Sequence, residues 1–305
     1  MTKNSLVFKP ATLDAAPATS SFVNPVQLAG MLDAWGVLPG ETYFREHVLR
    51  IVPDVSRTLR LEISRYLAGE LTLPDMAAMF LAGFRATQVA LSRDRVIEAV
   101  STTAVGVDNA VKRRLSAVSL PPQVNLFAYG LGDGSYEEAL RDWLLDSGAC
   151  EQVSMFGFDP NAQLQGRNIR LIDLNELDAL PAPDIFLARW VLHHVPYAER
   201  WAALLSILNR MRQGSVALIA EEGVFAVACE LSVAQRAYAL LFAILDILIN
   251  AAVHPLWIEH GEFFIDYLSE RDLEGIEAAL DVPVRRSSIE VDCDFLREVL
   301  LVYEF

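Results

Sequence analysis

The feature that most constrains this chain is a glycine-rich segment near its middle. An apolar run at 124–129 leads into Gly130, Gly132 and Gly134, and the amphipathic segment 135–148 follows. Small residues suit a tight turn at which a ligand approaches the backbone, and the first turn of a helix offers N–H groups without intrahelical partners. The segment therefore predicts a strand, a ligand-binding turn and a helix.

Residues around the expected helices indicate where they begin and end. Ser135 and Glu138 have the spacing of a capping box, and Gly148 is placed to end the helix that they begin. A second helix is expected to begin at Pro196 and to close at Gly214.

Short apolar runs alternate with these helical segments, which is typical of a parallel sheet covered on both faces. The expected fold class is therefore α/β with a doubly wound sheet. Two β-rich runs near the C-terminus, 282–291 and 296–305, could pair antiparallel at the sheet edge. The other strands are predicted at 124–129, 153–158, 169–172, 184–188 and 215–220.

Residues 24–115 follow a different pattern. Their apolar residues recur every three or four positions, with Gly or Pro between the segments and no strand pattern. We expect an N-terminal arm and helical cap at 1–119, and a ligand-binding domain at 120–305 that carries a helical insertion at about 224–279. A chain of 305 residues is long enough for a main domain with such a helical extension.

An acidic residue after the second predicted strand narrows the choice of ligand. The carboxylate of Asp159 could accept hydrogen bonds from both hydroxyls of a ribose, or it could be an exposed acid with no ligand. The glycines have the spacing G-x-G-x-G, whereas a dinucleotide fingerprint is G-x-G-x-x-G. With this spacing the segment resembles the first motif of the class I S-adenosylmethionine (SAM) dependent methyltransferases, an acid followed by G-x-G-x-G.

The resemblance covers roughly 120–223 and, more weakly, the last two predicted strands. It continues in DIFLARWVLHHV at 184–195, which looks like the family's fourth strand and the loop facing the reaction centre. It implies a seven-stranded, Rossmann-like sheet with SAM as the co-substrate. After the third strand the family often places an acid near the adenine amino group, and Asp173 stands at that place, although it could instead cap the turn that follows. The positions that the resemblance assigns to SAM binding are Tyr129, Gly130, Gly132, Asp133, Gly134, Asp159, Pro160, Asn161, Asp173, Leu174 and Arg189.

One position departs from the family pattern. The family usually has Asp or Glu two residues before the first glycine, in contact with the amino acid end of SAM, and this chain has Ala128. The methionine ammonium must then be held by backbone carbonyls or by a residue of the helical cap. The change is either family drift or a sign of a different use of SAM. One such use releases methylthioadenosine, as in azetidine-2-carboxylate synthases or nicotianamine-type transfer of the aminobutyrate group, and another is binding without catalysis.

Two histidines are the candidate catalytic residues. His193 and His194 follow the fourth strand, at the carboxyl edge where α/β sheets bind ligands. A neutral imidazole there could accept a proton from a substrate nucleophile near neutral pH. Alternatively, the histidines only begin a helix while Trp190 packs in the core. No metal is expected, because His254 and His260 lie six positions apart without a clear third donor.

Further polar residues have open interpretations. Glu221 and Glu222 suit a solvated turn better than a site for a cationic substrate. Asp246 lies on an apolar segment, and because a buried, unpaired carboxylate is costly, we expect Arg236 or a helix N-terminus as its partner, with a substrate amine as the alternative. An aromatic and imidazole cluster either lines a substrate pocket or packs against the cap: His254, Trp257, His260, Phe263 and Phe264.

Composition limits the partners. Lys plus Arg number 25 against 40 Asp plus Glu, and a net charge of −15 repels phosphate backbones and anionic lipid surfaces. No nucleic acid or membrane partner is therefore expected. The apolar stretch 238–253 is too short for a membrane span and is interrupted by polar residues, which favours a buried helix or the interface of a homodimer. Three widely separated cysteines and the lack of a secretory signal favour a cytoplasmic protein.

Together these features predict a SAM-dependent methyltransferase that acts on a small-molecule metabolite in specialised metabolism. The alternatives are an enzyme that releases methylthioadenosine from SAM and a protein that binds SAM without catalysis. A nicotinamide-dependent enzyme is the weakest alternative.

Overall fold

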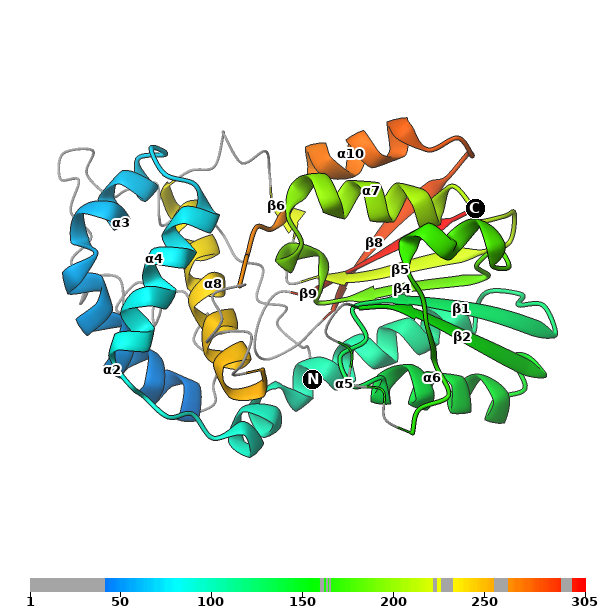
Figure 1. Ribbon diagram of the computed structural model, residues 1–305, viewed down its shortest axis with the longest axis horizontal. Helices are drawn as coiled ribbons and strands as arrows, with labels where there is room; N and C mark the ends of the chain where they lie inside the picture. Colours follow the sequence, from blue (N-terminus) through cyan, green and yellow to red (C-terminus); the bar gives the residue numbers. More distant parts are fainter. Residues whose placement is uncertain are drawn as a thin grey trace, which may run out of the picture.

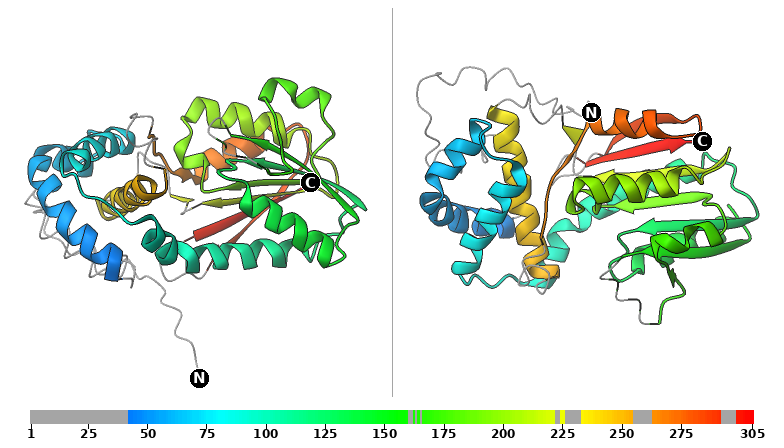
Figure 2. Two further views of the ribbon diagram at one scale, coloured as in Figure 1. Left: turned by 60° about the horizontal axis from the view of Figure 1, so that its bottom comes forward. Right: turned by 45° about the horizontal axis from the view of Figure 1, so that its top comes forward.

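The computed structural model describes residues 42–159, 162, 164, 166–221, 224–225, 233–254, 263–291 and 298–305. Over these residues the chain forms two lobes that lie side by side, a bundle of helices and a sheet covered by helices on both faces (Figure 1). The long helix α5, Arg93–Leu115, runs from the first lobe into the second (Figure 2).

The sheet lobe has seven strands in the order β3-β2-β1-β4-β5-β9-β8. Neighbouring strands are parallel except where β9 pairs with β5 and β8. The connections wind in opposite directions from β1 and β4, and doubly wound sheets bind ligands at this switch point. The strands of this sheet are β1 Gln123–Tyr129, β2 Gln152–Phe158, β3 Arg170–Leu171, β4 Ile185–Arg189, β5 Val216–Glu221, β8 Arg285–Val291 and β9 Glu298–Glu304.

This sheet confirms the predicted doubly wound α/β fold with seven strands. The first five predicted strands agree with the observed ones to within one residue at each end. The two C-terminal runs pair antiparallel as expected, but β9 lies between β5 and β8, so only β8 is at the edge. Helix α7, Tyr197–Leu208, ends before the predicted Gly214.

Strand side chains alternate between two apolar layers, as a sheet covered on both faces requires. In β1, Phe127 packs in the layer that holds α7 and α10, Glu270–Ala279. Its neighbour Leu126 packs in the opposite layer, with α6, Ser135–Asp146, and the second half of α5. Figure 2 shows these helix pairs on the two faces of the sheet.

The predicted capping box at the start of α6 is wrong. The N-cap is Gly134, with φ of 71°, and Ser135 donates from both its N–H and its hydroxyl to Oδ1 of Asp133. Glu138 is drawn away from the helix end because its Oε2 accepts from Nη1 of Arg167 at 2.6 Å. The helix therefore starts from a left-handed glycine, which is also the last glycine of the motif.

The helical lobe surrounds α8, Val233–Val253. This helix packs against α3 (Arg60–Leu67), α4 (Leu73–Ala86) and α5, and most of its described residues are buried. Helix α2 (Thr42–Thr58) packs against α4 and α5. No helix in the described part of the chain has the length and apolar character needed to cross a membrane. Large side chains of the shared core include Ile51, Tyr66, Met76, Phe80, Phe242 and Leu245.

Helix α5 contributes to both cores. Val96 and Ala99 are buried in the helical lobe, whereas Val107 and Val111 are buried under the sheet. Farther along the chain, α10 packs on the sheet, whereas α8 and the segment 263–267 of the expected insertion join the core of the helical lobe. A short two-stranded sheet between the lobes pairs β6, Val224–Phe225, with β7, Leu268–Ser269.

Candidate active site

The glycine-rich turn lies at the carboxyl end of β1. Gly130 and Gly132 have φ of 76° and 55°, a region that glycine occupies without steric cost. A Cβ at position 130 would lie 2.4 Å from Cγ2 of Val191, whereas a Cβ at position 132 would meet no atom of the described residues within 4 Å. The first glycine therefore permits close packing on the loop after β4, and the second faces open space in which a ligand can approach the backbone.

Asp159 comes directly after β2 and binds this turn. Its Oδ2 accepts from the backbone N–H of Gly132 at 2.9 Å. The structure thus brings together the acid and the glycine that the sequence assigned to one ligand. Tyr129, the last residue of β1, stacks on Phe158 at the end of β2 with ring centroids 5.1 Å apart.

Asp173 follows β3 and caps the next helical turn. Its Oδ1 accepts from the backbone N–H and the side-chain amide of Asn175, at 2.9 and 2.8 Å, which matches the capping alternative. Leu174 packs, partly buried, against the apolar layer on that side of the sheet. Pro160 and Asn161 lie outside the described residues.

Arg189, the last residue of β4, lies in an aromatic pocket. Its guanidinium carbon is 3.4 Å from the ring centroid of Tyr136 and 4.9 Å from that of Trp190. Burial lowers the pKa of Arg189, and burial raises the pKa of nearby Glu137 to about 7. Trp190 has an unusual φ of 51° and donates from Nε1 to Glu298 at 2.8 Å, so this side chain is held in place and is partly buried.

His193 and His194 lie on the short helical turn after β4, and their Nδ1 atoms both face acceptors. Nδ1 of His193 is 2.5 Å from Oε2 of Glu221, whose other oxygen accepts from the N–H of Leu192. Nδ1 of His194 is 2.9 Å from the carbonyl oxygen of Phe264. The interpretation of Glu221 as part of a solvated turn is wrong, because this residue is 1% exposed at the end of a central strand.

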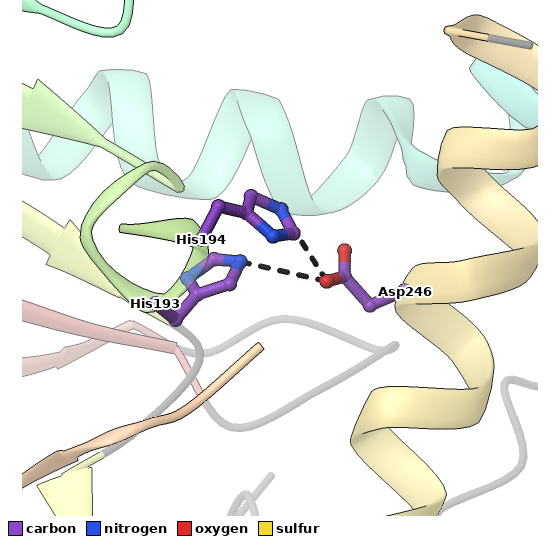
Figure 3. A group of neighbouring side chains, drawn as sticks. All are labelled: His193, His194 and Asp246. Atoms are coloured by element: carbon purple, nitrogen blue, oxygen red, sulfur yellow. Dashed lines mark ion pairs between the residues drawn. The ribbon is translucent and has the colours of Figure 1, made fainter. Parts of the chain in front are cut away.

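The Nε2 atoms of both histidines face Asp246 on α8 (Figure 3). The distances to Oδ2 of Asp246 are 3.6 Å from His193 and 3.4 Å from His194. Oδ1 of the same carboxylate accepts from the side-chain amide of Asn250 at 3.1 Å. Among the described residues the partners of Asp246 are therefore these side chains and not the expected Arg236 or a helix N-terminus.

Burial and charge act in opposite directions in this cluster. Burial alone would lower the pKa of His193, but Glu221 and Asp246 raise it well above its usual value. Burial lowers the pKa of His194 to about 4. Burial alone would raise the pKa of Asp246, but the two imidazoles lower it. The two imidazoles and the carboxylate therefore interact strongly with one another.

Helix α8 connects this cluster with the glycine-rich turn. Asp246 and His254 are eight residues apart, which corresponds to about 12 Å along a helix. Burial lowers the pKa of His254, just after α8, and the carboxylates of Asp159 and Asp133 beside the turn oppose that shift electrostatically. The helix therefore spans both parts of the candidate site.

The expected aromatic and imidazole cluster is only partly described. Phe263 packs its ring against His194, with centroids 5.3 Å apart, and Phe264 contributes its carbonyl to the same imidazole. Glu222, Trp257 and His260 fall outside the described residues. The contact of the two histidines with Asp246 could not be predicted, because positions 194 and 246 are far apart in the sequence. The only indication of this contact in the sequence was a lone acid on an apolar helix.

Comparison with known proteins gives distant structural matches. No family model and no curated protein matches the chain. The pyocyanin biosynthetic protein PhzM is 14% identical, with 87% of this chain and 73% of that chain covered and a TM-score of 0.46. The methyltransferase SibL is 14% identical, with 92% and 84% covered and a TM-score of 0.45. Human N-acetylserotonin methyltransferase is 14% identical, with 97% and 74% covered and a TM-score of 0.43.

These similarities are too distant to carry residue roles or substrates to this chain. The fold follows from the chain's own strand order, with β9 as the strand that runs against the others. The chain has the doubly wound, seven-stranded, Rossmann-like fold that the resemblance to class I methyltransferases implied.

Proposed function

We propose that this protein is a SAM-dependent methyltransferase that acts on a small molecule. The observation that carries the proposal is the pairing of Asp159 with the N–H of Gly132, at a turn that is open on its ligand side. A carboxylate after β2 can accept from ribose hydroxyls, and the turn after β1 gives a ligand access to the backbone. Both features lie at the switch point of the sheet.

The net charge of the protein and the enclosure that methyl transfer needs favour a small-molecule acceptor. A net charge of −15 disfavours nucleic acid. Enclosure matters for this reaction because the methyl carbon of SAM is attacked in line, and excluding water while aligning the nucleophile supplies much of the catalysis. His193 and His194, at the same edge of the sheet, are our candidates for handling the proton of the acceptor.

Calorimetric titration with SAM tests the cofactor assignment. We expect Gly132→Val to block the approach of the ligand, and Asp159→Ala to weaken SAM binding by about 10- to 100-fold, the worth of a hydrogen bond to a charged group. Asp178→Ala is the matched control, because its side chain is fully exposed. Wild-type affinity for SAM in both site variants would show that this turn does not bind the cofactor.

A second use of SAM remains a candidate because of Ala128. Ala128 has no carboxylate to offer the methionine ammonium, and it is buried in the apolar layer with α5 and α6. A desolvated amine loses its proton more readily, and a neutral amine could attack its own γ-carbon and release methylthioadenosine. Incubation with SAM alone, followed by mass spectrometry, separates the two reactions. Methyl transfer requires that S-adenosylhomocysteine forms only when an acceptor is added.

A further inference from the structure

Three atoms in the buried cluster have the spacing of metal ligands. His193, His194 and Asp246 each offer one ligand atom, and these three atoms all lie within 4.8 Å of one another. The Nε2 atoms of both imidazoles face Oδ2 of Asp246. Zinc binds nitrogen and oxygen ligands at about 2.0–2.2 Å, so two ligands of a tetrahedral site are roughly 3.3–3.6 Å apart. The two distances to Asp246, 3.6 and 3.4 Å, lie at this separation.

The hydrogen-bonding pattern orients the lone pair of His194 into the cluster. The carbonyl oxygen of Phe264 can only accept, so Nδ1 of His194 carries a proton, and in the tautomer with its single proton there Nε2 carries a lone pair. That lone pair faces a carboxylate oxygen at 3.4 Å. Two acceptors repel each other at this distance, and a cation between them removes the repulsion.

The second ring nitrogen of His193 has the kind of partner that it usually has in a metal-binding histidine; we call such a hydrogen-bond acceptor the outer partner. Its Nδ1 faces the carboxylate of Glu221, and ligating histidines commonly donate their other N–H to a carboxylate or a backbone carbonyl. Both kinds of outer partner occur here, one for each imidazole. These partners fix both rings with Nε2 toward Asp246.

Two of the three atoms have no hydrogen bond, although they are buried. Among the described residues, neither Nε2 of His193 nor Oδ2 of Asp246 has a hydrogen-bond partner. The residues are 0% and 4% exposed. A buried polar group without a partner is costly, and a carboxylate more so, so a further partner at these two atoms would stabilise the cluster.

We propose that His193, His194 and Asp246 bind a divalent transition metal ion of the zinc type, through two Nε2 atoms and Oδ2. Two imidazoles and one carboxylate suit zinc and its first-row neighbours. The two positive charges of the ion would be balanced by Asp246 and Glu221, which limits the cost of burying them. Three protein ligands leave a fourth position for water or for an oxygen atom of the acceptor.

The site would join the two lobes and change the role of the histidines. Both imidazoles come from the loop after β4, whereas Asp246 comes from α8 (Figure 3). As ligands, the two rings would hold a metal in the proposed methyl transfer and would not act as bases. Metal binding can be measured without SAM, so its failure would leave the proposed function standing.

Titration of the full chain with metal tests the inference. After removal of metals with a strong chelator and dialysis, we expect the protein to bind one equivalent of Zn²⁺ by calorimetry. One equivalent of Co²⁺ should give the intense visible absorption of a tetrahedral site. Zn²⁺ should also raise the melting temperature of the wild-type protein. Failure to bind either ion would overturn the proposal and leave a His193 imidazolium between Glu221 and Asp246.

Variants locate the ion. Asp246→Asn and His194→Ala remove ligands and should weaken Zn²⁺ binding by at least about tenfold, and Glu221→Gln should weaken it by about 10- to 100-fold through the outer partner. His47→Ala, on α2, is the matched histidine control and should bind as the wild type does. Circular dichroism establishes that each variant is folded. Wild-type affinity in the folded ligand variants would place the ion elsewhere and contradict the assignment.

Discussion

At the scale of single residues, the buried Glu137 makes a prediction about pH. Burial raises its pKa from 4.5 to about 7, although Arg189 opposes the shift, and Asp133 and Asp159 add to it. A carboxyl with a raised pKa in the folded state contributes stability that is fully present below pH 4.5 and is lost as the pH rises through about 7.

We therefore expect Glu137→Gln to be more stable than the wild type at pH 8, by on the order of 2–3 kcal/mol, and no more stable at pH 4.5. Urea unfolding at the two pH values measures the difference. Asp146→Asn, an exposed acid on the same helix, is the control and should change little at either pH. Equal stability of Glu137→Gln and the wild type at pH 8 would show that the carboxylate is already satisfied.

At this scale, the sequence predicted residues whose partners lie nearby in the chain and missed residues whose partners are distant. The three glycines and Asp159 were identified because turns and strand ends are local features. Asp246 and Glu221 were misread because their partners are distant in sequence, and only the fold brings α8 against the loop after β4. Glu221 also precedes a second acid, which suggested a solvated turn. Its strand, β5, however lies inside the sheet between β4 and β9.

At the scale of elements, α8 carries a prediction about the helical lobe. Phe242 is fully buried at the centre of this helix, and its ring packs edge-on to Tyr267 with centroids 5.9 Å apart. Removing a buried aromatic ring costs about 3–5 kcal/mol, since a cavity is left behind. We expect this loss of unfolding free energy for Phe242→Ala in urea titrations.

Val233→Ala on the same helix is the control, because Val233 is 56% exposed and should change the stability by less than about 0.5 kcal/mol. Similar losses in the two variants would mean that α8 is not buried as described.

The elements themselves were largely readable, because strand and helix periodicities are local. The position of β9 was not. Six of its seven residues are buried, which suits a central strand, whereas β8 has a mostly exposed pattern that suits an edge. The sequence contains this difference, because β9 is an apolar run and β8 begins with charged residues. The order of strands in a sheet, however, depends on contacts that periodicity does not encode.

At the scale of the whole molecule, the path of α5 limits how the protein can move. Its first half is held in one apolar core and its second half in the other. Because both halves are buried, the lobes cannot swing apart about a hinge within α5 without exposing one of the halves to water.

Ligands must then enter through local displacement of loops rather than by opening of the two lobes. We expect small-angle scattering curves recorded with and without SAM to superpose, in contrast to proteins that close over a ligand like a clamshell. A measurable compaction on adding SAM would show that the lobes move relative to each other. If they do not move, their spacing is set when the chain folds, and none of the binding free energy of an acceptor is used to bring them together.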